Sequence, residues 1–167
     1  MKELTESQRE ALELFTAGAE KLEKAVAGLT DEETDYNEAP GEWTIQQIVH
    51  HVAEDGDAWS LNFKKAIATP GVPVRFEGFP GNEAWADALA YDKRPLKSSL
   101  ILTKSHRQVM AELAERFADS WEQYVIIVDT DGKELHKVSA GQIIQMLSEH
   151  MEEHIAKIEE IKKTHDI

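Results

Sequence analysis

Cysteine is absent from the 167-residue chain. Its absence excludes disulfide bonds, thiolate nucleophiles, and zinc or iron–sulfur sites built on cysteine. Any metal site must therefore take its ligands from histidine and carboxylate side chains. The chain has seven histidines and 32 aspartates and glutamates, so such ligands are plentiful.

Basic residues are scarce. Lys and Arg total 18 against 32 Asp and Glu, which gives a formal net charge of −14 at pH 7. This charge argues against nucleic-acid binding through a basic patch and against docking to an anionic membrane. We therefore expect a small molecule as the substrate, and neither nucleic acid nor a membrane as a partner.

Long apolar runs are also missing. No stretch approaches the roughly 20 residues that span a bilayer, and the opening MKELTESQRE lacks the apolar core of a signal peptide. We expect a cytoplasmic protein. Hydrophobic residues make up 41% and charged residues 30% of the chain, as in ordinary globular proteins, and the length suits a single domain over residues 1–167.

Apolar positions spaced by three and four residues predict four long amphipathic helices. The first begins at Thr5, which forms a capping box with Gln8. The second runs from near Thr44 to before Pro70, the third opens at Pro95, and the last follows Ser139. The run YVIIVDTDGKELHKV, before the last helix, predicts a small β-hairpin. The expected fold is all-α: a four-helix bundle with this hairpin and a long loop between the second and third helices.

The long loop covers residues 69 to about 94 and is rich in proline and glycine. A turn between antiparallel helices needs only about 2–8 residues. The extra length predicts either a crossover to a parallel third helix or a loop that covers the bundle, and we favour the crossover. We therefore expect part of the segment between Phe76 and Tyr91 to lie near the ligand cavity, and Pro70 and Gly71 to lie away from it.

A helical wheel separates two adjacent histidines on the second helix. At about 100° per residue, His51 falls at the edge of the apolar stripe and His50 falls close to the opposite side. His51 is expected to point inward and His50 to face solvent. Asp55, one turn after His51, lies nearer the stripe, where it can orient a ligand or act as a base.

On the last helix, His150 and His154 flank the buried face one turn apart. Such a pair alone is more often structural than metal-binding, and a lone inward histidine is usually a hydrogen-bonded core residue. Three inward histidines from two helices, however, are costly to bury without a shared partner. They predict a divalent metal site formed by His51, His150 and His154, with an open position where a bound water becomes acidic.

The other histidines carry weaker signals. His106 projects toward the inner face of the third helix, where a core position or support of the metal ligands is the first interpretation and direct ligation is the second. His50, His136 and His165 are interpreted as surface residues.

Two motifs and their order resemble the DinB/YfiT-like superfamily. The run GEWTIQQIVHHVAED is similar to that family's second-helix signature, in which a tryptophan opens the helix and a histidine follows eight residues later; here they are Trp43 and His51. The run EHMEEHIAKI is similar to the last-helix motif, whose two histidines correspond to His150 and His154. The PLKSSL entry to the third helix and the hairpin resemble the YfiT branch, so the resemblance extends over nearly the whole chain.

The resemblance implies a four-helix bundle, a three-histidine site for zinc or nickel, and a homodimer. Family members are described as metal-dependent hydrolases, and related branches as thiol S-transferases or isomerases that use bacillithiol or mycothiol. We predict a metal-dependent enzyme whose ion activates water or a low-molecular-weight thiol such as bacillithiol. Two alternatives remain open: a non-catalytic, stress-related bundle that binds a metal or small molecule, and a dimeric helical protein without metal.

Overall fold

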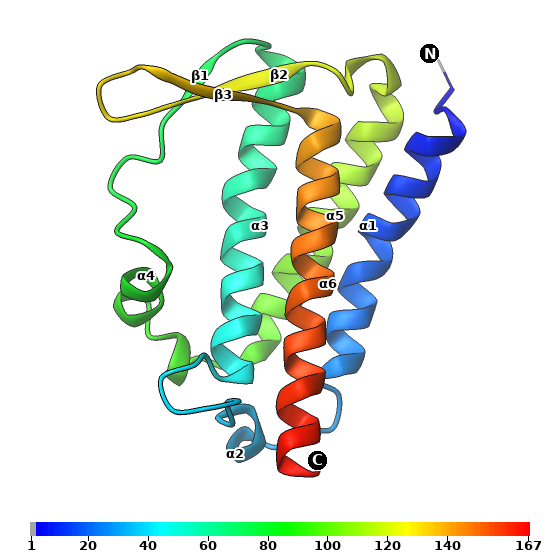
Figure 1. Ribbon diagram of the computed structural model, residues 1–167. Helices are drawn as coiled ribbons and strands as arrows, with labels where there is room; N and C mark the ends of the chain where they lie inside the picture. Colours follow the sequence, from blue (N-terminus) through cyan, green and yellow to red (C-terminus); the bar gives the residue numbers. More distant parts are fainter. Residues whose placement is uncertain (1–2) are drawn as a thin grey trace.

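The computed structural model describes residues 3–167 and shows a four-helix bundle, as predicted (Figure 1). The four long helices are α1 (Glu6–Ala25), α3 (Ile45–Ala68), α5 (Leu96–Arg116) and α6 (Ala140–His165). The short helical segments are α2 (Asp31–Thr34), α4 (Asn82–Ala88), η1 (Tyr91–Lys93) and η2 (Ala118–Ser120). The strands are β1 (Pro73–Val74), β2 (Tyr124–Val128) and β3 (Glu134–Ser139). No helix in the described part of the chain is both long and apolar enough to cross a bilayer.

Capping boxes fix where the helices begin. In each box a Ser or Thr side chain accepts from the backbone of a residue three positions later, whose own side chain accepts in return. The boxes are Thr5 with Gln8, Thr30 with Glu33, Thr44 with Gln47, and Ser139 with Gln142. Three of them begin long helices at the expected residues, and the fourth begins α2, which lies in a polar segment that shows no helical periodicity.

The helix directions explain the long loop. In Figure 1, α3 and α5 run in one direction, and α1 and α6 run in the other. Because α3 and its neighbour α5 are parallel, the chain must return along the whole bundle between them, through α4 and η1. The predicted crossover is confirmed.

A three-stranded sheet closes one end of the bundle. The antiparallel pair β2 and β3 is the predicted hairpin, with Tyr124 opposite Ser139. The third strand, β1, pairs in parallel with β2, and the Gly71 amide donates to the Tyr124 carbonyl at 2.7 Å. Pro70 and Gly71 therefore belong to the sheet end, as expected.

The buried interior contains two apolar clusters with a polar layer between them. The sheet-end cluster includes Leu12, Phe15, Phe63, Met110, Val125, Ile143 and Leu147. The α2-end cluster includes Leu22, Ile45, Ile48, Val49, Met151, Ile158 and Ile161. Buried polar residues that lie between the two clusters along the helices include Ser60, Thr103, Arg107 and Ser148.

Arg107 ties three helices together in this layer. Its guanidinium donates to the Phe15 carbonyl on α1 and, at 2.7 Å, to the Leu147 carbonyl on α6. Burial lowers the pKa of Arg107 to about 10, so the side chain stays charged at neutral pH. A Cβ on Gly18 would lie 2.8 Å from Arg107 Nη1, which explains a glycine at this helical position.

Candidate metal centre

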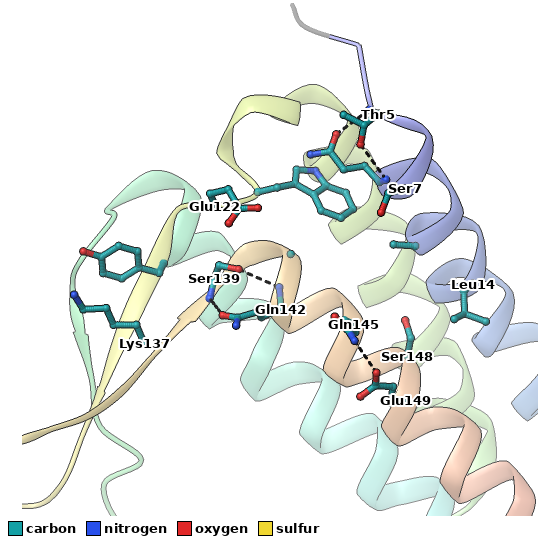
Figure 2. Close-up of a pocket in the computed structure, with 15 residues that line it drawn as sticks. Thr5, Ser7, Leu14, Glu122, Lys137, Ser139, Gln142, Gln145, Ser148 and Glu149 are labelled. Atoms are coloured by element: carbon teal, nitrogen blue, oxygen red, sulfur yellow. Dashed lines mark hydrogen bonds between the residues drawn. The ribbon is translucent and has the colours of Figure 1, made fainter.

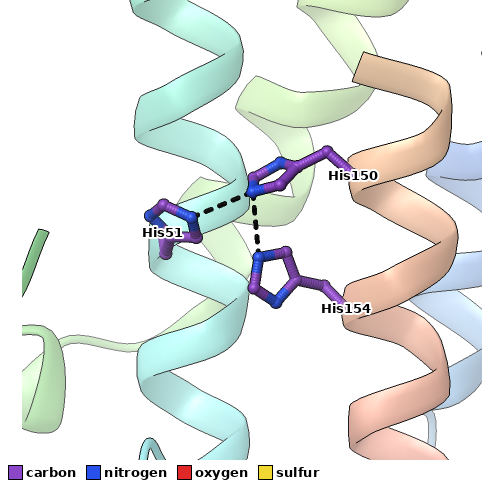
Figure 3. A group of neighbouring side chains, drawn as sticks. All are labelled: His51, His150 and His154. Atoms are coloured by element: carbon purple, nitrogen blue, oxygen red, sulfur yellow. Dashed lines mark hydrogen bonds between the residues drawn. The ribbon is translucent and has the colours of Figure 1, made fainter. Parts of the chain in front are cut away.

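Three histidine side chains meet between α3 and α6 (Figure 3). His150 Nε2 lies 3.1 Å from His51 Nε2 and 3.0 Å from His154 Nε2. In the described part of the chain, this is the group of histidine and carboxylate side chains whose ligand atoms lie close enough to share one ion, all within 4.8 Å of one another. The residues selected from the sequence as metal ligands are therefore brought together in space.

The environment keeps the imidazoles of His51 and His154 neutral. Burial, with contributions from His154 and His150, lowers the pKa of His51 to about 3. Burial, together with His150 and Lys157, lowers the pKa of His154 to about 4. At neutral pH these rings therefore have lone pairs available for a metal ion.

The nitrogen geometry suits a shared ion better than hydrogen bonds alone. A ring nitrogen carries either one hydrogen or one lone pair, so His150 Nε2 cannot make a well-formed hydrogen bond to both of its neighbours. Tetrahedral zinc with bonds of about 2.0–2.1 Å places its ligand nitrogens about 3.3 Å apart. The distances of 3.1 and 3.0 Å need only a small expansion to reach that value. The donor set fits a divalent metal.

Two side chains support the cluster. Asp55 Oδ2 lies 3.5 Å from His150 Nδ1, the ring nitrogen that faces away from the other histidines. Burial raises the pKa of Asp55, and His150 opposes that effect. The Trp43 ring packs edge-on against His51, with 4.8 Å between ring centroids. Asp55 is thus placed to hold the proton on His150 Nδ1, which leaves Nε2 free as a ligand.

The prediction that His50 faces solvent is wrong. Its side chain is fully buried, with Nδ1 2.8 Å from Ser99 Oγ and Nε2 2.8 Å from the Arg94 carbonyl. The wheel assumed one buried stripe, but α3 packs against α6 on one side and against α5 and η1 on another. The face of α3 that carries His50 is therefore covered by the chain that returns through the long loop.

The remaining histidines lie outside the cluster. His106 Nε2 is 3.0 Å from Asp57 Oδ1, so His106 is paired with a carboxylate rather than with the three histidines. His136 is exposed, as expected. His165 is exposed but ordered against the chain: it stacks on Tyr36 with 4.4 Å between centroids, and its Nε2 lies 2.8 Å from the Asn37 carbonyl.

A cleft of about 570 Å³ opens beside the cluster. Its lining includes His51 and Asp55 from α3, and Phe76, Trp85 and Tyr91 from the long loop. The prediction that this loop returns to the histidine region is confirmed. The individual wall residues were not foreseen, because a loop without periodicity shows its path only once it is folded.

A larger hollow lies elsewhere on the molecule. It has a volume of about 910 Å³ and lies where the start of α1 meets the start of α6 and the sheet (Figure 2). Its lining is dominated by hydroxyl and amide side chains, including Thr5, Gln8, Ser139 and Gln142. These side chains are largely occupied in capping boxes. The hollow therefore lacks the converging ligand atoms found beside the cleft.

The family model of the DinB superfamily matches residues 14–158. The chain belongs to the DinB superfamily. The match covers every element that contributes a histidine to the cluster, so family membership and geometry concern the same part of the molecule.

Two curated relatives have the same name, "Putative metal-dependent hydrolase". The protein from Geobacillus kaustophilus is 30% identical over 99 residues, which are 59% of this chain and 54% of that protein. The protein from Bacillus pumilus is 29% identical over 123 residues, 68% of each chain. The chain thus matches about half of the first relative's length and about two thirds of the second's.

Solved structures share the fold at low identity. YfiT from Bacillus subtilis, described as a probable metal-dependent hydrolase with an unusual four-helix bundle topology, gives a TM-score of 0.83 at 20% identity, over 99% of this chain and 92% of that one. A mycothiol-dependent maleylpyruvate isomerase gives 0.64 at 20% identity, over 94% and 67%. The parallel arrangement of α3 and α5 is therefore found in a YfiT-like fold.

Proposed function

We propose that this protein is a metal-dependent enzyme whose ion, zinc or nickel, is held by His51, His150 and His154. The observation that carries the proposal is the convergence of three imidazole nitrogens from two helices, two of them 3.1 and 3.0 Å from the third. Three neutral nitrogen ligands leave a coordination position free, as catalytic sites do. The names of the curated relatives support the same activity class.

A divalent ion in this position would lower the pKa of a bound water or thiol and would so provide a nucleophile near neutral pH. The chain provides the rest of the site. Asp55 keeps the proton of His150 on Nδ1. It also lines the cleft, so its carboxylate is in the cavity where the nucleophile would bind. His51 lines the cleft from the cluster side, and residues of the long loop line its other side.

Hydrolysis is the reaction we put first, because the curated relatives are named as hydrolases. Transfer to a low-molecular-weight thiol such as bacillithiol is the second reaction, favoured by the shared fold of the mycothiol-dependent isomerase. Since the chain contains no cysteine, any thiol nucleophile must come from a bound cosubstrate.

The deciding experiment has two stages. Protein purified without a metal-affinity tag is analysed for bound metal, and the expected result is one zinc or nickel ion per chain. The loaded protein is then screened against ester, amide and electrophilic substrates, with and without bacillithiol. Turnover that requires the metal supports the enzyme; metal binding without turnover supports the non-catalytic alternative; absence of metal contradicts the proposal.

We further propose a homodimer, on the strength of family resemblance. Light scattering at high protein concentration is expected to give twice the chain mass of 18.8 kDa. A mass that stays at the monomer value contradicts it.

A further inference from the structure

The cleft beside His51 has aromatic walls that metal chemistry alone does not require. Trp59 and Phe76 form one ring pair with centroids 5.4 Å apart, and Phe79 and Trp85 form another at 5.7 Å. Phe76 is 40% exposed and Phe79 46% exposed. Exposed apolar residues that gather around one cavity indicate a binding site, and this cavity is continuous with the histidine cluster.

The inner end of the cleft has a hydrogen-bond donor. Tyr91 is 1% exposed, and its buried hydroxyl makes no hydrogen bond of ordinary geometry. The Trp85 side chain interacts with the hydroxyl oxygen, but an indole N–H can only donate, so the hydroxyl hydrogen has no acceptor. Burial raises the pKa of Tyr91, so the hydroxyl keeps its proton at neutral pH. An unsatisfied buried donor destabilises a folded protein, which points to an acceptor that the bound ligand provides.

Two of the carboxylates that line the cleft already have partners. Glu54 Oε1 lies 3.3 Å from Arg94 Nη1, and Asp57 Oδ1 lies 3.0 Å from His106 Nε2. The other charged side chains of the lining are Asp55, Glu77, Lys65 and Arg75, two of each sign, so the cleft has no strong excess of charge that would demand an ionic ligand. Apolar contact and one hydrogen bond therefore dominate recognition.

We propose that this cleft binds a neutral small molecule with a planar apolar body, held between the two aromatic pairs, and an oxygen acceptor that bonds to the Tyr91 hydroxyl. The volume of about 570 Å³ is in the range of small-molecule sites, about 300–1,000 Å³. The identification of this ligand as the substrate rests on the proposed metal-dependent function; the binding itself does not.

Two matched probes test the proposal by equilibrium dialysis with the full-length protein as purified, whose metal content is measured in parallel. One is 2-acetonaphthone, which has a planar ring system and a carbonyl acceptor, and the other is 2-ethylnaphthalene, which lacks the acceptor. Tyr91→Phe is expected to weaken binding of 2-acetonaphthone about fivefold, the value of a typical hydrogen bond, and to leave 2-ethylnaphthalene unchanged. Equal effects on both probes overturn the role of Tyr91.

The aromatic walls are tested by the double variant Phe76→Ser with Phe79→Ser, whose exposed side chains make folding defects a minor concern. Both probes are expected to bind at least tenfold more weakly. The control is Leu135→Ser, because Leu135 is 58% exposed on β3 outside the cleft, and this variant is expected to bind both probes as the unmodified protein does. Circular dichroism checks that every variant is folded.

Other outcomes decide against the proposal or against the metal function separately. Unchanged probe binding in the double variant overturns the proposal. If the double variant instead abolishes self-association in light scattering and leaves probe binding intact, the patch is an interface between copies and the proposal is wrong. If the protein holds no metal but shows the expected probe pattern, the metal function fails and the ligand proposal stands.

Discussion

The two buried histidines on opposite sides of α3 have different partners. On the side toward α5 and η1, both ring nitrogens of His50 have oxygen partners at 2.8 Å. On the side toward α6, the Nε2 of His51 faces another imidazole nitrogen at 3.1 Å. Adjacent residues on one helix are thus buried for opposite reasons. Burial alone does not identify a histidine as a metal ligand. A metal ligand is indicated by a ring nitrogen that lacks an oxygen partner and faces other ring nitrogens.

The largest expected effect is the loss of metal on replacing His51. His51→Ala removes one of three ligands, so the bound metal should fall from one ion per chain to none after dialysis. His50→Ala should retain one ion, because its nitrogens are engaged by Ser99 and Arg94. Elemental analysis of tag-free protein measures both. Loss of the ion from the His50 variant, with retention in the His51 variant, would reverse the assignment of the two sides.

A smaller effect is expected at Asp55. Asp55→Asn removes the carboxylate beside His150 Nδ1, and loss of such a supporting partner weakens metal binding about 10–100-fold. Competition with a chromophoric chelator gives the affinity. Asp57→Asn is the matched control, because Asp57 contacts His106 and not the cluster. Equal losses in the two variants would show that general charge, and not orientation of His150, is responsible.

On the other side of α3, His50→Ala should lower the free energy of unfolding and leave metal binding unchanged. It leaves the Ser99 hydroxyl and the Arg94 carbonyl without their partner, and it opens a cavity in a fully buried site. The expected loss in unfolding free energy is about 2–3 kcal/mol, measured by urea titration. His136→Ala, at an exposed position on β3, should change it little. A His50 variant as stable as the control would contradict the buried network.

The stability of the metal-free protein should also depend on pH. The folded-state pKa values of about 3 for His51 and about 4 for His154 lie below the usual value near 6.5. The unfolded chain therefore binds protons first, so stability is retained above about pH 6.5 and falls as pH drops toward 4. Each histidine contributes at most about 1.4 kcal/mol per pH unit.

Thermal unfolding between pH 7 and pH 4.5 measures this slope. The double variant His51→Ala with His154→Ala should show a flatter dependence than the unmodified metal-free protein. An identical slope in both proteins would mean that other groups are responsible.

Helix boundaries and the ligand cluster could be predicted because both depend on local spacing. Thr44 and Gln47 fix the start of α3, and the four-residue separation of His150 and His154 fixes their common side. The environment of His50 could not be predicted, since it is made by Ser99 and Arg94, which are distant in the chain. Likewise β1 is two residues long and exists only because β2 provides its partner. Features set by tertiary contacts leave no periodic signal.

The parallel arrangement of α3 and α5 also bears on how quickly the chain finds its fold. Helices that are consecutive in the chain are not paired as short hairpins here: Arg107 on α5 bonds to the Phe15 carbonyl on α1 across 92 positions, and His51 on α3 meets His150 on α6 across 99. Folding rates fall as contacts become more distant in sequence, because closing long loops loses chain entropy before any contact forms. This bundle should therefore fold more slowly than an up-and-down four-helix bundle of equal length and stability.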